Sequence, residues 1–149
     1  MAADPPAGAS YPRARRVLER VARLGDGWLT FAVTPDTLRE RLGVLEEFRA
    51  GLGRAEGGLP VCVFLNVNVS SASNVALDDA LSVWKRQSTR NLSADQLQRA
   101  AAVGSPEQGA DFIGRLIEAG ATAVAIDLLS KNPQAQLEII SERLLPLLA

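Results

Sequence analysis

Three small residues near the start of the chain have the types and the position to bind an anion. Gly8, Ala9 and Ser10 lie just before a helix that the sequence predicts from Pro12 to Leu24. Small side chains let a ligand approach the backbone closely. The first turn of a helix also offers unpaired N–H groups at the positive end of its dipole. The loop is therefore a candidate site for the phosphate group of a cofactor.

Two asparagines in a predicted strand form the second candidate. Asn66 and Asn68 lie two residues apart in the apolar run from Val61 to Val69, so both point to the same face of that strand, together with Phe64. They fall in its C-terminal half, the end at which α/β barrels carry their sites. The alternative interpretation is that the strand ends in solvent there, with the asparagines bonded to nearby backbone. The sequence favours neither interpretation over the other.

The chain contains no histidine, which removes several kinds of catalytic site. A Ser-His-Asp triad, a Cys-His pair and a histidine-ligated metal all require that side chain. The carboxylates are scattered over predicted helix faces without metal-ligand spacing, so we expect no metal site. The single cysteine, Cys62, has no partner for an internal disulfide. The catalytic residues are therefore unknown, and any chemistry must come from a bound cofactor or from another chain.

Length and charge narrow the class of protein further. A chain of 149 residues fits one domain, and its net charge of -1 favours neither a nucleic-acid partner nor a charged tail. The apolar runs are far shorter than the ~20 residues of a membrane span. No apolar segment follows basic residues at the N-terminus, so no signal peptide is visible. These features predict a cytoplasmic protein that binds no nucleic acid and does not enter a membrane.

Amphipathic helices alternate with short apolar strands along most of the chain. Proline in the first turn after a Thr34 or Ser105 cap marks two of the helix starts. This alternation is typical of an α/β protein with a parallel sheet and right-handed crossovers. The predicted strands cover 28–33, 61–69 and 121–127, and the main helices cover 12–24, 34–51, 105–120 and 133–148. The helical period of the last segment predicts four buried residues: Leu137, Ile140, Leu144 and Leu147.

The segment from Ser70 to Gly104 interrupts this alternation. It contains a predicted helix over 76–87 and a short helix that begins after Ser93, with Gln96 at the capping-box position. Such a segment is too long for an ordinary connection between elements. We interpret residues 70–104 as a helical insertion, or lid.

Three blocks of the sequence resemble the C-terminal part of the luciferase-like monooxygenases. These enzymes are (β/α)-barrel oxidoreductases that use FMN or a deazaflavin. The blocks occur in the family's order, and the insertion lies where the family often varies. They are AGASYPRARRVLERVARLGDGWL at 7–29, TPDTLRERLGVLEEFRAGLGR at 34–54, and VGSPEQGADFIGRLIEAGATAVAID at 103–127.

The resemblance implies a fold, a cofactor and an activity. The fold would be the C-terminal half of a (β/α)8 TIM barrel, with residues 1–149 as one partial domain and residues 1–11 as a truncated cofactor-loop region. The cofactor would be FMN or a deazaflavin coenzyme, with its phosphate on Gly8, Ala9 and Ser10. The activity would be hydride transfer to or from a small organic substrate, as in a flavin-dependent oxidoreductase or monooxygenase. The family's turn residues match Gly25–Gly27, which we interpret as structural.

The predicted strands are too few to close an eight-stranded barrel. One sheet face and two strand edges would then be exposed, so the chain is expected to need a partner. That partner would be a second copy or a separately encoded N-terminal half. The alternatives are that the chain's own lid rearranges to cover the sheet, or that the chain is a truncated gene product. The alternative function is a non-catalytic half-barrel interaction module or a remnant of such an enzyme. A doubly wound nucleotide-binding domain is less well supported, because no Gly-x-Gly-x-x-Gly follows a strand.

Overall fold

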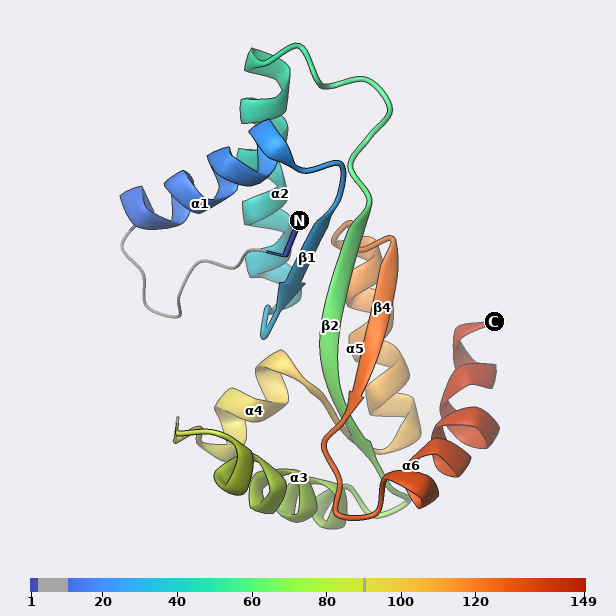
Figure 1. Cartoon of the computed structure of the whole chain (residues 1–149). Helices are drawn as coiled ribbons and strands as arrows, with labels where there is room; N and C mark the ends of the chain where they lie inside the picture. The colour runs from blue at the N-terminus through green and yellow to red at the C-terminus, as the bar shows by residue number, and fades with distance from the viewer. Residues whose placement is uncertain (3–10, 90) are drawn as a thin grey trace. The chain divides into compact units, whose positions relative to one another are not determined.

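The computed structural model describes residues 1–2, 11–89 and 91–149 (Figure 1). The chain divides into two compact units. The first contains residues 1–64 and 116–125, and the second contains residues 65–115 and 126–149. The predicted phosphate loop, Gly8, Ala9 and Ser10, lies outside the described residues.

Helices and parallel strands make up the structure, as the sequence predicts. The strands are β1 (Trp28–Phe31), β2 (Val61–Val69), β3 (Ala102–Gly104) and β4 (Ala123–Leu128). The helices are α1 (Tyr11–Leu24), α2 (Pro35–Gly51), α3 (Ser73–Gln87), α4 (Ala94–Ala100), α5 (Pro106–Glu118) and α6 (Pro133–Ile139). β1 and β3 each pair in parallel with β2, and β4 also pairs with β2. The described strands form an open sheet, which confirms an α/β fold with a partial barrel.

In the first unit, β1 lies beside the first half of β2. The register runs from Trp28 opposite Val61 to Phe31 opposite Phe64. The backbone of Met1 and Ala2 adds a short parallel bridge on β1, with Leu29 N–H donating to Met1 O at 2.9 Å. Helices α1 and α2 pack together, and the largest buried side chains are apolar, among them Leu18, Leu38, Leu45 and Trp28.

The start of α2 follows the predicted capping pattern. The Thr34 side chain accepts a hydrogen bond from Thr37 N–H at 3.1 Å, and Pro35 occupies the first turn. After α2 the chain makes a glycine-rich turn before β2. Gly57 and Gly58 have φ values of 85° and 67°, a backbone conformation that favours glycine.

In the second unit, the end of β2 pairs with β3. Helices α3 and α4 confirm the two helices predicted within 70–104, and the Ser93–Gln96 capping box is present. β3 was not predicted, because three residues are too few to show a strand pattern. A small apolar core joins these elements: Ala76, Ala80, Val83, Leu97, Ala101, Val103 and Leu129.

The C-terminal segment departs from the single helix predicted over 133–148. After α6, residues 140–144 form a π-helical turn and residues 145–148 a 3-10 turn. Pro146 has no N–H and its ring disfavours a continuous α-helix, which accounts for the change of winding. Ile140 and Leu144 are buried as predicted, but Leu137 and Leu147 were wrongly predicted as core residues and are exposed.

Candidate functional site

The two asparagines of β2 differ in burial and bonding. Asn68 is 1% exposed, whereas Asn66 is half-buried. The Asn68 amide nitrogen donates to Leu129 O at 2.7 Å and to Asp79 Oδ2 at 2.9 Å, so both of its hydrogens are used. In the described part of the chain, the Asn66 side chain makes no hydrogen bond. Asn66 is therefore the asparagine with an amide available to a ligand.

Asp79 is the centre of the polar cluster around Asn68. Besides Asn68 it accepts hydrogen bonds from Ser130 Oγ at 2.7 Å and from Lys131 N–H at 3.2 Å. The Lys131 ammonium lies 3.6 Å from its other oxygen. Burial by itself would raise the pKa of Asp79, but the hydrogen bonds and the charge of Lys131 outweigh it and lower the pKa. Asp79 is thus held as an anion that ties α3 to the segment after β4.

A pocket of about 410 Å³ opens beside this cluster in the second unit. It lies at the carboxyl end of β2, where parallel α/β proteins place their ligand sites. It combines amide, hydroxyl, carboxylate and ammonium groups with a short apolar wall. The lining residues are Asn68, Ser70, Val75, Ala76, Asp78, Asp79, Lys131, Gln136 and Ile139.

Gln136 closes the end of β2 next to the pocket. Its Oε1 accepts from Val69 N–H at 2.9 Å, and its Nε2 donates to Val69 O at 2.9 Å. A side-chain amide presents the same donor and acceptor pair as a neighbouring strand. Val69 therefore keeps a paired backbone, and the pocket wall is held in place.

Sequence reasoning found only part of this cluster. It singled out Asn66 and Asn68, but not Asp79, Lys131 or Gln136. One signal was present, because a run of polar residues begins at Ser130, shortly after the carboxyl end of a strand. The described residues contain no group of three His, Cys, Asp or Glu side chains that could hold a metal ion.

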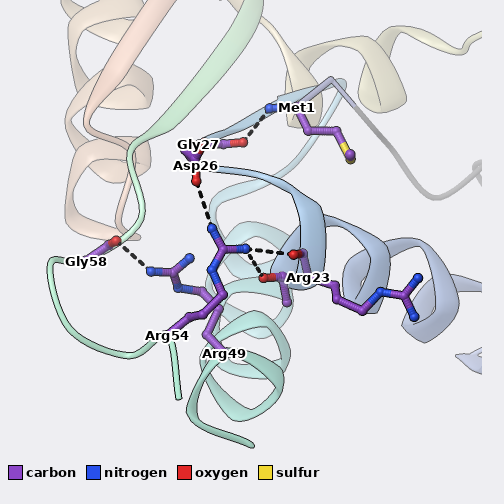
Figure 2. Close-up of polar contacts among 8 residues, drawn as sticks. Met1, Arg23, Asp26, Gly27, Arg49, Arg54 and Gly58 are labelled. Atoms are coloured by element: carbon purple, nitrogen blue, oxygen red, sulfur yellow. Dashed lines mark hydrogen bonds and ion pairs between the residues drawn. The ribbon is translucent and has the colours of Figure 1, made fainter. Parts of the chain in front are cut away.

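A separate polar cluster lies in the first unit, at the turn after α1 (Figure 2). Arg54 donates to Asp26 Oδ1 at 2.7 Å and to the carbonyls of Ala22 and Arg23. The Met1 ammonium group donates to Gly27 O. These contacts fit the structural role expected for this turn.

Solved structures with a similar arrangement of strands and helices include two F420-dependent enzymes and a monooxygenase in complex with FMN. The coenzyme F420-dependent tetrahydromethanopterin reductase from Methanopyrus kandleri is 14% identical, with a TM-score of 0.76 over 100% of this chain and 50% of that chain. An F420-dependent secondary alcohol dehydrogenase, solved with an F420-acetone adduct, is 17% identical, with a TM-score of 0.75 over 91% of this chain and 46% of that one.

A third solved structure resembles the chain less closely. It is the FMN complex of the oxygenating constituent of 3,6-diketocamphane monooxygenase from Pseudomonas putida. It is 16% identical, with a TM-score of 0.57 over 87% of this chain and 45% of that chain. The chain thus spans about half the length of these structures.

The fold defines this chain as part of a parallel α/β barrel. The sequence model of the luciferase-like monooxygenases matches residues 7–123, and the chain belongs to that family. A comparison with curated protein sequences finds no significant match. Among the described residues, no helix has the length and apolar character needed to cross a membrane.

Proposed function

We propose that this chain forms the cofactor-binding C-terminal part of an oxidoreductase that transfers hydride through a flavin or a deazaflavin. The observation that carries the proposal is the parallel scaffold shared with F420- and FMN-dependent enzymes, with a polar pocket at the carboxyl end of β2. The substrate class is a small organic molecule.

Among the described residues, the Asn66 side chain suits the ring of such a cofactor. The polar edge of a flavin or deazaflavin alternates N–H and C=O groups. The Asn66 amide offers both a donor and an acceptor, and in the described residues neither is used. We assign Asn66 to that polar edge. The loop Gly8, Ala9 and Ser10 is a separate proposal for the phosphate, and it rests on the sequence alone. When bound, the cofactor supplies the redox chemistry, and the protein supplies orientation and a dry pocket.

Asn68 has a supporting part in this proposal. Because Leu129 and Asp79 take both amide hydrogens, Asn68 fixes the wall of the cofactor site instead of reading the cofactor's edge. Asp79 of α3 and Lys131 of the segment after β4 form an ion pair in the same wall. The arrangement binds and orients; within the described residues, we assign no general acid or base.

A titration of the chain with FMN and with F420, followed by fluorescence, tests the proposal. We expect saturable binding of one of the two, which also identifies the cofactor. The Asn66→Ala variant should weaken binding by about tenfold, the value of a lost pair of hydrogen bonds. The matched control is Asn91→Ala, an exposed asparagine between α3 and α4, which should leave binding unchanged.

A non-catalytic half-barrel module is the second candidate, and one observation favours it. Phe31 and Phe64 face each other across β1 and β2, with 51% and 42% of their surface exposed. Exposed aromatic neighbours on a sheet are typical of a surface that another chain covers. The covering chain would be a second copy or a separate N-terminal half-barrel. Binding of neither cofactor, with stable binding of a second chain, would support this function and contradict the first.

A further inference from the structure

A second pocket, of about 390 Å³, lies at the amino end of β2 within the first unit. Its walls come from α2, from the glycine-rich turn that follows α2, from the first residue of β2, and from Gly120 in the segment between α5 and β4. Most of the lining residues are apolar or are glycines. The lining residues are Leu42, Leu45, Glu46, Arg49, Ala50, Ala55, Gly58, Leu59, Val61 and Gly120.

Arg49 places a buried cation in this pocket. The residue is 7% exposed, and its Nη2 donates to Gly58 O at 3.0 Å (Figure 2). No described carboxylate lies within 4.0 Å of its guanidinium group. Glu46 lines the same pocket without forming an ion pair to it.

Arg49 lines the pocket and has further donors that no described residue uses. A guanidinium carries five N–H groups, and in the described structure this one makes a single hydrogen bond. Every buried side-chain nitrogen or oxygen among the described residues has a hydrogen-bond partner. The unbonded nitrogens of Arg49 therefore keep some accessible surface, although the residue as a whole is buried.

The buried Arg49 cation has no counter-ion among the described residues. Burial of a charge without a counter-ion is unfavourable, and a carboxylate that bonds a guanidinium with both oxygens offsets part of this cost. The volume lies within the roughly 300–1,000 Å³ of small-molecule pockets. We propose that this pocket binds a small organic carboxylate, with its charge on Arg49 and a branched or aromatic body against Leu42 and Leu59.

The site is distinct from the proposed cofactor site in its residues. The one residue of β2 that lines this pocket is Val61, the first of the strand. Asn66 and Asn68 lie in the second half of β2 and do not line it. Gly58 connects the pocket to the turn between α2 and β2, because its carbonyl holds Arg49. A bound carboxylate would therefore also stabilise that turn.

Calorimetric titration with benzoate and 2-naphthoate tests the proposal, with 2-naphthamide as the uncharged control. We expect at least one carboxylate to bind saturably, and 2-naphthamide to bind about tenfold or more weakly than 2-naphthoate. Arg49→Met should cause a loss of about tenfold or more for the same reason. Glu46→Gln should instead strengthen binding, by roughly two- to fivefold at low salt, because it removes a negative charge from the pocket.

A third variant keeps the test decisive if Arg49→Met does not fold. Ala50 is exposed on α2 and lines the pocket, so Ala50→Phe fills the space while Arg49 stays in place. We expect this variant to lose carboxylate binding with an unchanged circular dichroism spectrum. Binding of neither carboxylate, equal binding of 2-naphthoate and 2-naphthamide, or full binding by Ala50→Phe would each overturn the proposal.

Discussion

The guanidinium of Arg54 joins the Asp26 carboxylate to the end of helix α1. It lies 2.7 Å from Asp26 Oδ1, and its other terminal nitrogen lies 2.9 Å from the carbonyl oxygens of both Ala22 and Arg23. These carbonyls belong to the last turn of the helix, where the backbone runs out of intrahelical donors. One side chain from the turn after α2 thus caps α1 and fixes the turn into β1.

Arg54→Met should destabilise the chain more than Asp26→Asn does. The arginine variant leaves two helix carbonyls without donors and should lower the free energy of unfolding by about 1–3 kcal/mol. The exposed ion pair is worth less, about 0–1 kcal/mol. Urea unfolding measures both values, with the exposed Arg86→Met as control. Equal losses for the Arg54 and Asp26 variants would show that the ion pair, and not the capping, stabilises the turn.

Asp79 should make the stability of the chain depend on acid pH. Its pKa is lowered in the folded state from the ordinary value of 3.8, so the folded chain holds the anion more tightly than the unfolded chain. The contribution to stability is complete above pH 3.8 and is lost as the pH falls through the lower folded pKa.

Asp79→Asn should therefore be less stable than the parent at pH 6, and the difference should shrink towards pH 2. Thermal unfolding at a series of pH values measures it. Asp78→Asn, at the exposed neighbouring position, is the control. A difference that stays constant across this range would rule out Asp79 as the source of the pH dependence.

Ser10→Asp should abolish the binding of any phosphate-bearing cofactor. The introduced carboxylate would repel the phosphate at the start of the predicted helix, where an anion is otherwise favoured. Ser10→Ala, which adds no charge, is the control and should retain binding within a few-fold. The same fluorescence titration measures both variants, and unchanged affinity in Ser10→Asp would mean that the loop does not hold the phosphate.

The isolated chain should associate with itself through its exposed sheet face. Phe31 and Phe64 are neighbours in the β1–β2 register, and about half of each side chain is exposed. Light scattering should detect species larger than a monomer, and Phe31→Lys with Phe64→Lys should shift them towards monomer. Substitution of the exposed Val75 by Lys, in α3, controls for the general effect of added charge. A monodisperse parent monomer that binds no hydrophobic dye would contradict the expectation.

The α/β fold could be predicted because its signals are local. Thr34 and Pro35 mark a helix start within two residues, and the apolar run over 61–69 is long enough to identify a strand. The three residues of β3 carry no such pattern. The end of the last helix was wrong because Pro146 disfavours a continuous α-helix, and Leu147 lies in the 3-10 turn that replaces it. Leu137 lies in the regular part of α6 and is exposed, although its helical spacing predicted a core position.

The candidate site was only partly predictable because its contacts are distant in sequence. Asn68 bonds Asp79, 11 positions away, and Leu129, 61 positions away. Strand periodicity placed Asn66 and Asn68 on one face, but only the fold shows that the Asn68 amide is already used. The buried charge of Arg49 was equally hidden, because in the sequence it resembles any basic residue in the last turn of a helix.

The double hydrogen bond between Gln136 and Val69 has a consequence for hydrogen exchange. The final amide of a strand ordinarily exchanges with solvent as that end frays. Here the Val69 amide proton is held by a side chain of α6, so it becomes accessible only when α6 detaches. The exchange rate of this amide would therefore report the detachment of α6 directly. The Gln136→Glu variant cannot donate to Val69 O, so it should exchange this proton faster while the rest of α6 is unchanged.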